Sequence, residues 1–309
     1  MSDEMKIAAI GECMIEISGV PDGGMTLAYG GDTLNTALYL ARLAGDKDPQ
    51  VDFLTALGDD PYSDEMLANW QDEGIGTNLV ARLPGRLPGL YTIRTDCKGE
   101  RSFYYWRRAA AAREMMRGKV GVRLAEALCG YNLIYLSGIT LSILTTNDRQ
   151  ALLTALERAI SSGVRLAFDS NYRPRGWPSR QTAATAMDEV YRRCHIALPS
   201  LDDECALHGK MDATTAARRI ANLGVAEICL KDGDNGCFLY HGGDGLQGVP
   251  ALAAVMPVDT TAAGDSFNAA YLFSRLHGDC QVEAAIAGNL LAARVIQYPG
   301  AVIPSEAMP

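Results

Sequence analysis

A segment near the C-terminal end of the chain combines small residues with one carboxylate, in an order that suits phosphoryl transfer to an alcohol. Asp259–Phe267 reads Asp-Thr-Thr-Ala-Ala-Gly-Asp-Ser-Phe and leads into an apolar run that predicts a helix. The free N–H groups of Ala262, Ala263 and Gly264 would lie at the N-terminus of that helix and form an anion site with its dipole. Asp265 cannot bind the same anion, because like charges repel. Its carboxylate can instead take the proton of a hydroxyl that attacks the anion.

The same residue types also have a purely structural interpretation. Gly264 and Asp265 are compatible with simple helix capping, since Asp is a common N-cap residue. A second segment, Gly30-Gly31-Asp32-Thr33-Leu34-Asn35, opens a helix expected over 32–44. Its paired glycines permit close backbone approach to a ligand and positive φ angles. Asp32 and Asn35 offer a carboxylate and an amide to sugar hydroxyls, with capping by Asp32 as the alternative. Each segment is a weak signal alone, and together they are a specific one.

The composition limits the classes of protein to which the chain can belong. Its 309 residues suffice for one large α/β domain or two smaller ones, and the 48% hydrophobic content is ordinary for a soluble enzyme. The net charge of −9 argues against a nucleic-acid or anionic-membrane partner. No apolar run approaches the roughly 20 residues of a membrane helix, and the N-terminus has no signal-peptide pattern. We therefore expect a cytoplasmic enzyme.

Cysteine and histidine usage gives no sign of a metal centre. The eight cysteines contain no Cys-x-x-Cys pair, and the four histidines show no ligand spacing. This pattern argues against a structural zinc site or a disulfide framework and favours reduced, mostly buried thiols.

Apolar runs that resemble buried strands alternate with helical patterns through most of the chain. Strands are expected at 6–10, 51–55, 133–137, 164–168 and 227–231, and helices near 32–44, 62–73, 146–162, 180–193 and 212–223. This alternation predicts a mainly parallel central sheet with helices on both faces. Polar or glycine-bearing stretches follow the strands at Gly11-Glu12, Ser137-Gly138, Asp169-Ser170-Asn171 and Lys231-Asp232-Gly233. Because binding sites of such sheets lie beyond the carboxyl ends of the strands, we expect the chemistry there.

Two regions break this alternation. Residues 12–29 and 88–107 are richer in strand-like patterns, and Cys97-Lys98-Gly99-Glu100 is predicted to form a turn between strands at 90–95 and 101–107. We interpret both regions as excursions that form a small β-sheet lid over the site. The whole chain, 1–309, is then a single α/β domain.

Together, the two chemical segments make the chain resemble the PfkB (ribokinase-like) carbohydrate kinase family. Its signatures are a Gly-Gly…Asn segment near the N-terminus and an Asp-Thr-x-Gly-Ala-Gly-Asp segment near the C-terminus, and the resemblance covers essentially all 309 residues. It implies a ribokinase-like fold and ATP-dependent phosphorylation of a sugar. One residue departs from the family pattern: Ala262 stands where most members have glycine. The anion site is expected to survive this change if φ at Ala262 is negative.

Within the family, several segments are similar to those of kinases that act on 2-keto-3-deoxygluconate, a six-carbon keto-acid. They are Ile10–Glu16, Tyr29–Thr36, Arg86–Tyr91, Phe103–Arg107, Asn171–Pro174 and Ala301–Pro304. The resemblance implies that Asp265 is the base and that the substrate is contacted by Gly31, Asn35, Tyr91, Tyr105, Arg107 and Arg173.

The residue chemistry agrees with an anionic sugar. Arg107 and Arg173 offer bidentate donors to a carboxylate, and Tyr91 and Tyr105 offer hydroxyls on a lid that must exclude water. The alternatives are mutual packing of the aromatic residues, which we favour for Tyr104 and Trp106, and a surface ion pair for Arg173.

The candidate ATP-binding residues are inferred from the family resemblance more than from residue chemistry. Lys231–Gly236, with Gly233, Asp234 and Gly236, resembles the nucleotide loop, although Asp-Gly and Asn-Gly also predict a hairpin turn before 237–240. Asn171 and Asn289 are further candidates for ATP contacts, with an exposed helix position as the alternative for Asn289. The Asn-x-x-Glu element of the family is imperfect, because Leu201 occupies the asparagine position when Glu204 is aligned with its glutamate.

Magnesium is expected to arrive with ATP, with Glu204 acting indirectly through bound water. The resemblance leaves room for a monovalent cation such as K⁺. A homo-oligomer is expected, since exposed lid strands tend to pair. A kinase of fructose or another ketose and a non-catalytic sugar or nucleotide sensor remain as alternatives. A dinucleotide-binding dehydrogenase is disfavoured, because no Gly-x-Gly-x-x-Gly follows the first strand.

Overall fold

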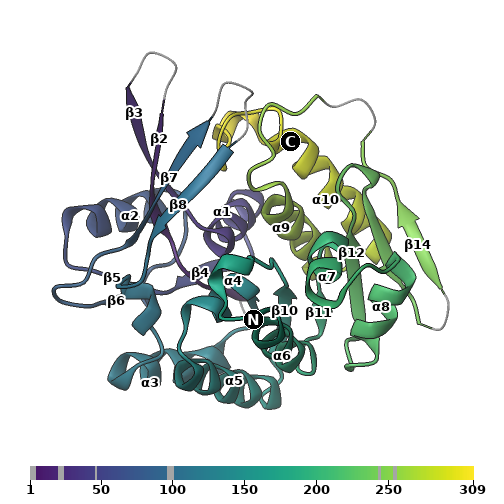
Figure 1. Ribbon diagram of the computed structural model, residues 1–309, viewed down its shortest axis with the longest axis horizontal. Coiled ribbons are helices and arrows are strands. Elements are labelled where there is room, and N and C mark those ends of the chain that lie inside the picture. The colour runs from purple at the N-terminus through teal and green to yellow at the C-terminus, as the bar shows by residue number, and fades with distance from the viewer. Residues whose placement is uncertain (1–4, 20–23, 46, 96–100, 243–244, 253–255) are drawn as a thin grey trace.

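An eight-stranded sheet forms the centre of the protein (Figure 1). The computed structural model describes residues 5–19, 24–45, 47–95, 101–242, 245–252 and 256–309. The strand order is β14-β13-β12-β11-β10-β9-β1-β4. The strands are β1 (Lys6–Ile10), β4 (Gln50–Leu54), β9 (Leu133–Ser137), β10 (Arg165–Asp169), β11 (Ile196–Ala197), β12 (Glu227–Lys231), β13 (Cys237–Tyr240) and β14 (Leu246–Val249). Pairing is parallel from β4 to β12 and antiparallel from β12 to β14, so the prediction of a mainly parallel sheet is confirmed.

Helices cover both faces of this sheet, because its strands alternate apolar side chains toward the two sides. Ile7 and Ala9 of β1 pack in one core and Ala8 and Ile10 in the other, and all four are fully buried. One layer contains α1 (Asp32–Ala44), α2 (Pro61–Asp72), α9 (Ala263–Leu276) and α10 (Gln281–Val295). The other contains α3 (Gly118–Ala127), α4 (Gly138–Ile143), α5 (Thr146–Ser161), α6 (Arg180–Tyr191), α7 (Leu201–His208) and α8 (Ala213–Ala221).

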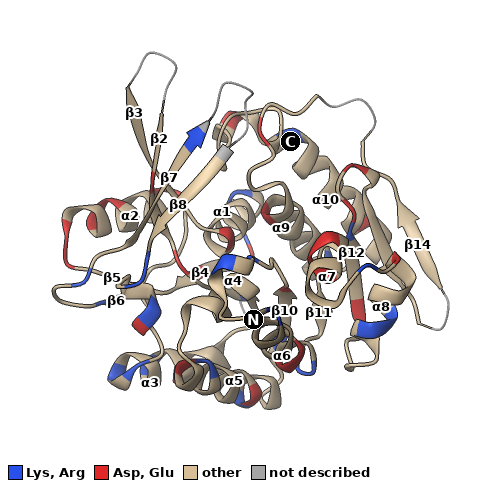
Figure 2. Ribbon diagram, in the orientation of Figure 1, with Lys and Arg blue, Asp and Glu red and all other residues tan. Residues whose placement is uncertain are grey.

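The expected helices are present, with ends that differ from the prediction by no more than two residues. Figure 2 shows acidic and basic residues interspersed along the ribbon of both layers. In the part of the chain that the structure describes, no helix combines the length and apolarity needed to cross a bilayer.

A second, four-stranded sheet stands beside the central one and projects from it at the upper left of Figure 1. Its order is β3-β2-β7-β8, built from β2 (Met14–Gly19), β3 (Met25–Gly30), β7 (Gly89–Thr95) and β8 (Arg101–Trp106). The prediction of a small sheet from these two excursions is confirmed. The predicted turn at Cys97–Glu100 lies outside the described residues. A short parallel pair, β5 (Ala56–Leu57) with β6 (Ala81–Arg82), completes the strands.

Register assigns each side chain of the small sheet to one of two faces. Glu16, Tyr91 and Tyr105 lie in one row across β2, β7 and β8, on the face that also carries the buried Met14. Tyr104 belongs to the opposite face. We call these the inner and the outer face of the small sheet.

Candidate active site

The two predicted chemical segments meet at the N-termini of α1 and α9. Asn35 on α1 donates from Nδ2 to Oδ2 of Asp265 on α9 at 2.8 Å, and Thr36 Oγ1 donates to the Asp265 carbonyl at 3.1 Å. Neither acidic residue caps its own helix, because the N-caps are Gly31 and Ala262, without side-chain cap bonds. The capping interpretation is therefore wrong for both Asp32 and Asp265. Their carboxylates are left available for other partners.

The surroundings of Asp265 make its carboxylate a base suited to neutral pH. Burial, together with the nearby charges of Asp32 and Asp169, raises the pKa of Asp265 to about 7, while Asn35 and Lys231 oppose the shift. A general base works best when its pKa lies near the operating pH. This arrangement is suited to removing a proton from an alcohol.

Lys231 brings a positive charge to the same place. It ends β12, and its Nζ donates to Asp169 Oδ2 at 2.7 Å and to Asn268 Oδ1 at 2.9 Å. A Cβ built on Gly264 would lie 3.4 Å from Lys231 Nζ, so the ammonium group adjoins the first turn of α9. Asp169 and Asn268 were not predicted as site residues. Asp169 carried a signal, since it begins the polar stretch that directly follows a predicted strand, whereas nothing in the sequence marked Asn268.

Asn171 holds the second carboxylate of the site. Its Nδ2 donates to Asp32 Oδ2 at 2.6 Å, and its own backbone has φ 33°, the left-handed region that Asn tolerates better than most residues. Contact between Asn171 and the nucleotide stays a prediction. The bond from Asn171 fixes the position of the Asp32 carboxylate.

The turn before α9 is held by Asp259. Its carboxylate accepts bonds from Thr261 N at 2.8 Å, from Thr261 Oγ1 at 2.7 Å and from Gly300 N at 3.0 Å. Within the described part of the chain, the N–H groups of Gly264 and Asp265 have no protein acceptor. The N–H of Gly264 belongs to the predicted anion site, whereas that of Asp265 was not part of the prediction.

Among the described residues, the N–H of Ala262 also has no acceptor, as predicted, whereas that of Ala263 does. Ala263 N donates to Thr260 O at 3.3 Å and so closes a turn. Ala262 has φ 60° and ψ 13°, so the condition of a negative φ is not met: alanine occupies the left-handed conformation that glycine adopts without strain. The shape of the turn is therefore kept at a cost in strain.

The glycine pair serves close packing rather than backbone freedom. Among the described positive-φ glycines, neither Gly30 nor Gly31 is present, so that part of the prediction is wrong. A Cβ on Gly31 would lie 2.1 Å from the carbonyl oxygen of Glu12, and one on Gly30 would lie 2.6 Å from the Tyr91 hydroxyl. Gly31 thus allows α1 to begin directly against the chain that enters the small sheet.

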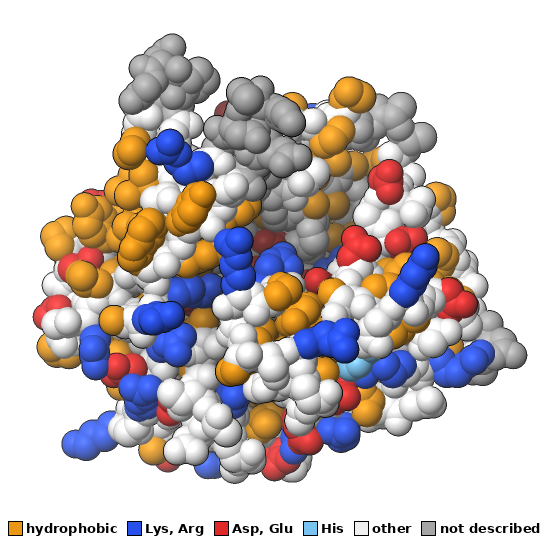
Figure 3. Space-filling view, viewed as in Figure 1, with side chains coloured by type: hydrophobic (Ala, Val, Ile, Leu, Met, Phe, Trp, Pro, Cys, Tyr) orange, Lys and Arg blue, Asp and Glu red, His pale blue; other side chains and the backbone are white. Residues whose placement is uncertain are grey.

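The predicted residues of the small sheet already have partners. The Tyr91 hydroxyl donates to Glu16, and Arg107 Nη2 donates to Glu12 Oε2. The Arg107 guanidinium also lies 5.9 Å from the Tyr105 ring centre. Figure 3 shows a hollow between the small sheet and the body of the protein, with basic side chains at its edge.

Among the described residues, Tyr104 and Trp106 form no ring contact with another aromatic side chain, contrary to our interpretation. They are 52% and 62% exposed on the outer face.

Arg173 remains mostly exposed and pairs weakly. Its Nη1 donates to Tyr172 O at 3.0 Å and lies 3.8 Å from Asp203 Oδ1. Asp203 faces the site: burial raises its pKa, with further contributions from Asp169, which raises it, and from Arg173 and Lys231, which lower it. Arg173 thus forms the ion pair of the alternative interpretation while most of its side chain stays accessible.

Glu204, the predicted magnesium residue, is engaged elsewhere. Its side chain is fully buried and accepts bonds from Tyr191 at 2.9 Å and from Arg219 at 2.6 Å. The structure thus brings Asp203, rather than its neighbour, to the cluster around Lys231. Ser200 is the N-cap of α7, and its hydroxyl accepts a hydrogen bond from Asp203 N at 3.1 Å.

The predicted nucleotide loop forms the β12–β13 connection. Gly233 and Gly236 have φ 54° and 96°, and a Cβ on Gly236 would lie 2.2 Å from Val249 O, so both positions require glycine. The predicted hairpin is confirmed, with an exposed Asp234 at its tip. Asn289 is buried and donates to Pro250 O at 3.1 Å, so the alternative of an exposed helix position is wrong.

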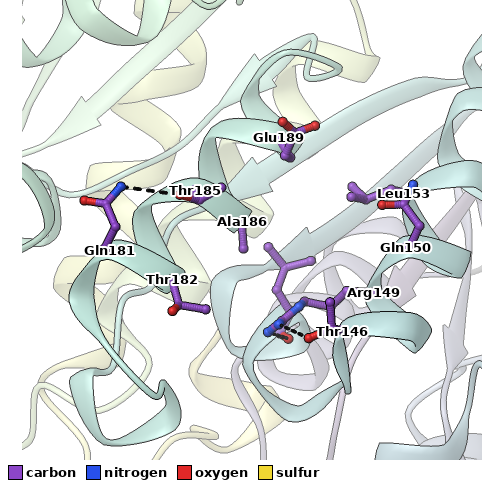
Figure 4. A pocket seen from close by; sticks show the side chains of 10 residues that line it. Thr146, Arg149, Gln150, Leu153, Gln181, Thr182, Thr185, Ala186 and Glu189 are labelled. Carbon is purple, nitrogen blue, oxygen red and sulfur yellow. Dashed lines mark hydrogen bonds between the residues drawn. The ribbon is translucent and has the colours of Figure 1, made fainter.

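A separate depression lies between α5 and α6, away from these residues (Figure 4). It is lined mainly by polar side chains, among them Arg149, Gln181 and Thr185. None of the predicted site residues lines it.

The chain matches a known protein family. A model of the pfkB family carbohydrate kinases matches residues 4–308. The chain belongs to the PfkB family of carbohydrate kinases. It is 45% identical over 305 residues to the 2-dehydro-3-deoxygluconokinase of Dickeya dadantii, covering 98% of each chain. It is 44% identical over 306 residues to that of Escherichia coli K12, covering 98% of this chain and 99% of the relative.

A solved structure shares the fold. Fructokinase from Xylella fastidiosa, crystallised with bound ATP, aligns with TM-score 0.83 and 21% identity, covering 98% of this chain and 95% of the other. A fructokinase with this architecture therefore binds ATP.

Replacing Ala262 with glycine tests the strain in the anion turn. Left-handed backbone costs an alanine roughly 1–2 kcal/mol, and glycine's greater freedom when unfolded returns roughly 0.5–1 kcal/mol of that. Ala262→Gly should therefore raise the free energy of unfolding by up to about 1 kcal/mol. The neighbouring Ala263→Gly, whose φ is not positive, should lower it by about 0.5–1 kcal/mol. Chemical denaturation compares the two variants, and equal losses in both would contradict strain at Ala262.

Proposed function

We propose that this protein transfers the γ-phosphoryl group of ATP to the C6 hydroxyl of 2-dehydro-3-deoxy-D-gluconate. The observation that carries the proposal is Asp265, a carboxylate of raised pKa placed beside free helix N–H groups and Lys231. The choice of substrate is supported by relatives of 41–45% identity that are 2-dehydro-3-deoxygluconokinases. Arg107 supplies a cation for the carboxylate of such a substrate. The chain acts as one domain, with the small sheet as its lid.

The proposed reaction uses each group in one role. Asp265 takes the proton of the C6 hydroxyl as its oxygen attacks the γ-phosphorus. The N–H groups at the start of α9 stabilise the charge on the transferring phosphoryl oxygens, and Lys231 adds a positive charge next to them. Asp32 and Asn35 bind sugar hydroxyls, with Gly31 giving the substrate close access to the backbone. Tyr91, Tyr105 and Arg107 close over the sugar acid from the inner face of the lid.

The nucleotide is proposed to lie along the β12–β13 connection, near Gly233, Asp234 and Gly236, with Asn289 at its far edge. Mg²⁺, the usual companion of ATP, would be held mostly by phosphate oxygens and water. Asp203 fits an indirect contact with that ion, because it is a mostly buried carboxylate facing Lys231. Glu204 fits less well, since Arg219 and Tyr191 occupy its oxygens. A monovalent cation stays a prediction of the family resemblance.

Removing the carboxylate of Asp265 should abolish most of the turnover. Asp265→Asn should lower kcat by about 10²–10⁴-fold, because the base is lost, while sugar binding is retained. The wild-type kcat should fall at acid pH, because protonated Asp265 can no longer act as base; the pKa of about 7 is that of Asp265 in the enzyme without substrates. Steady-state rates at saturating substrates measure both effects. A D265N enzyme within tenfold of wild type would place the base elsewhere.

Replacing Arg107 tests recognition of the substrate carboxylate. A hydrogen bond between charged groups contributes about 1.5–3 kcal/mol, so Arg107→Gln should raise KM for the sugar acid by about 10–100-fold. KM for ATP should change little, and the adjacent exposed Arg108→Gln serves as the control. Arg173→Gln tests the second arginine in the same way. Equal effects on both KM values would contradict carboxylate recognition, and a higher kcat/KM for fructose than for the keto-acid would favour the ketose-kinase alternative.

We further propose that the protein is cytoplasmic and forms a homo-oligomer through the outer face of the lid. Two rows of side chains cross this face. One includes Leu27 and Tyr104, which are 45% and 52% exposed, and the other ends at Trp106. Met25, 77% exposed, extends the face along β3. An apolar face of this kind is typical of protein–protein contacts, and a second copy of the same sheet would match it in chemistry.

Polar substitutions on the outer face should dissociate this oligomer. The double variant Y104S/W106S removes two large apolar side chains from the proposed contact and should be a monomer. Light scattering after size-exclusion chromatography gives the mass directly. Val122→Ser on α3, also an exposed apolar position at 58%, is the control and should keep the wild-type mass. A monomeric wild-type protein would overturn the proposal.

A further inference from the structure

Glu12 and Arg107 form an ion pair at the base of the lid. Glu12 follows β1, where the chain leaves the central sheet, and Arg107 follows β8, the last strand of the lid. Arg107 Nη2 donates to Glu12 Oε2. The Glu12 side chain is 1% exposed and that of Arg107 is 20% exposed. The guanidinium that we propose for the substrate carboxylate therefore already has an internal carboxylate partner.

This pair is enclosed but incompletely bonded. Among the described residues, Glu12 Oε1 and Arg107 Nε are buried without a hydrogen-bond partner. A Cβ on Gly89 would lie 2.8 Å from Glu12 Oε1 and 3.1 Å from Arg107 Cβ, which shows how closely β7 covers both residues. A buried ion pair is stable only when its remaining polar atoms are satisfied. The pair is thus arranged to accept a further ligand.

The charges that face Glu12 come from three elements besides its own. Arg107 at the end of β8 and Arg113 in the short helix 111–114 favour the ionised carboxylate, and Asp32 at the start of α1 opposes it. On its own segment, Cys13 is a neutral thiol whose pKa is raised by burial and by Glu12. Burial outweighs the two arginines, so the pKa of Glu12 is raised in the absence of substrate.

We propose that Glu12 takes up a proton when Arg107 receives the carboxylate of the sugar acid, so that the anionic substrate binds together with one proton. The proton comes from solvent, one Glu12 oxygen becomes O–H, and no bond of the substrate changes. The proposal rests on the proposed function, since it requires an anionic substrate at Arg107.

The physical reason is that two carboxylates would otherwise share one guanidinium in a region shielded from water. An added like charge raises the pKa of a neighbouring carboxylate, and Glu12 has little water left to oppose this. Thermodynamic linkage between proton binding and substrate binding then determines how the affinity for the sugar acid changes with pH. Because substrate binding raises the pKa of Glu12, protonation of Glu12 strengthens substrate binding to the same degree. Affinity for the sugar acid is therefore highest at low pH and decreases as the pH rises from the pKa of free Glu12 to that of the complex.

Calorimetry of 2-dehydro-3-deoxy-D-gluconate binding without ATP tests this proton uptake. Titrations in two buffers of different ionisation enthalpy give the number of protons taken up. They are run in the Asp265→Asn background, because Asp265 titrates near 7 and would add its own proton. D265N should take up a large fraction of one proton, and D265N/E12Q should take up almost none. D265N/E12D, which keeps a titratable group, should retain the uptake.

The pH dependence of the Kd for the sugar acid is a second measurement, and a purely structural role of Glu12 would not change it. In the D265N background, this Kd should rise by up to tenfold per pH unit between the two pKa values of Glu12, whereas D265N/E12Q should give a nearly flat profile. The neutral amide of the substrate should bind without proton uptake. Binding of the sugar acid by D265N without proton uptake would overturn the role of Glu12, even if E12Q does not fold. Failure of the wild-type enzyme to phosphorylate the sugar acid, with turnover of a neutral ketose, would instead overturn the proposed function.

Discussion

The site depends on holding three carboxylates close together without neutralising them. Each accepts a hydrogen bond from a different asparagine; the pairs are Asp32 with Asn171, Asp169 with Asn268, and Asp265 with Asn35. An amide donor satisfies an oxygen lone pair but carries no charge, so the mutual repulsion of the carboxylates persists. Lys231 supplies a positive charge among them. That repulsion, added to burial, keeps Asp265 a stronger base than an ordinary aspartate.

The fold explains how such a cluster can exist. Parallel strands end at the same edge of the sheet, so β10 and β12 deliver Asp169 and Lys231 side by side. The helices α1 and α9 begin at this edge and direct their positive ends toward it. Their partial charges offset part of the repulsion and leave N–H groups free for an anion. The topology therefore brings the charged groups together, and the neighbouring side chains set how far the pKa of Asp265 is raised.

Most of the architecture could be predicted because hydrophobic periodicity and strand–helix alternation are local properties of the sequence. The small sheet was predicted in this way, as were the strands and helices β1, β4, β9, β10, β12, α1, α2, α5, α6 and α8, whereas β11, β14, α3 and α7 were not. Contacts between distant residues could not be, since nothing local links Glu12 to Arg107 or Asn268 to Asp169. The backbone conformation of Ala262 could not be predicted from the sequence either. Alanine normally implies negative φ, yet here the tertiary structure imposes the left-handed conformation. Asp203 was not predicted, because the family spacing pointed to its neighbour Glu204. In the structure, Tyr191 and Arg219 bond the oxygens of Glu204.

The bond between Asp259 and Gly300 connects the anion turn to the segment that follows α10. That segment is itself fastened to α1, where Tyr39 donates to Ala301 O at 2.8 Å and Arg42 donates to Ile303 O at 2.6 Å. A strap of four residues thus ties the phosphate end of the site to the sugar end from behind. A substitution in this strap would change how the turn is held against α1 without altering any group that we propose to contact a reactant.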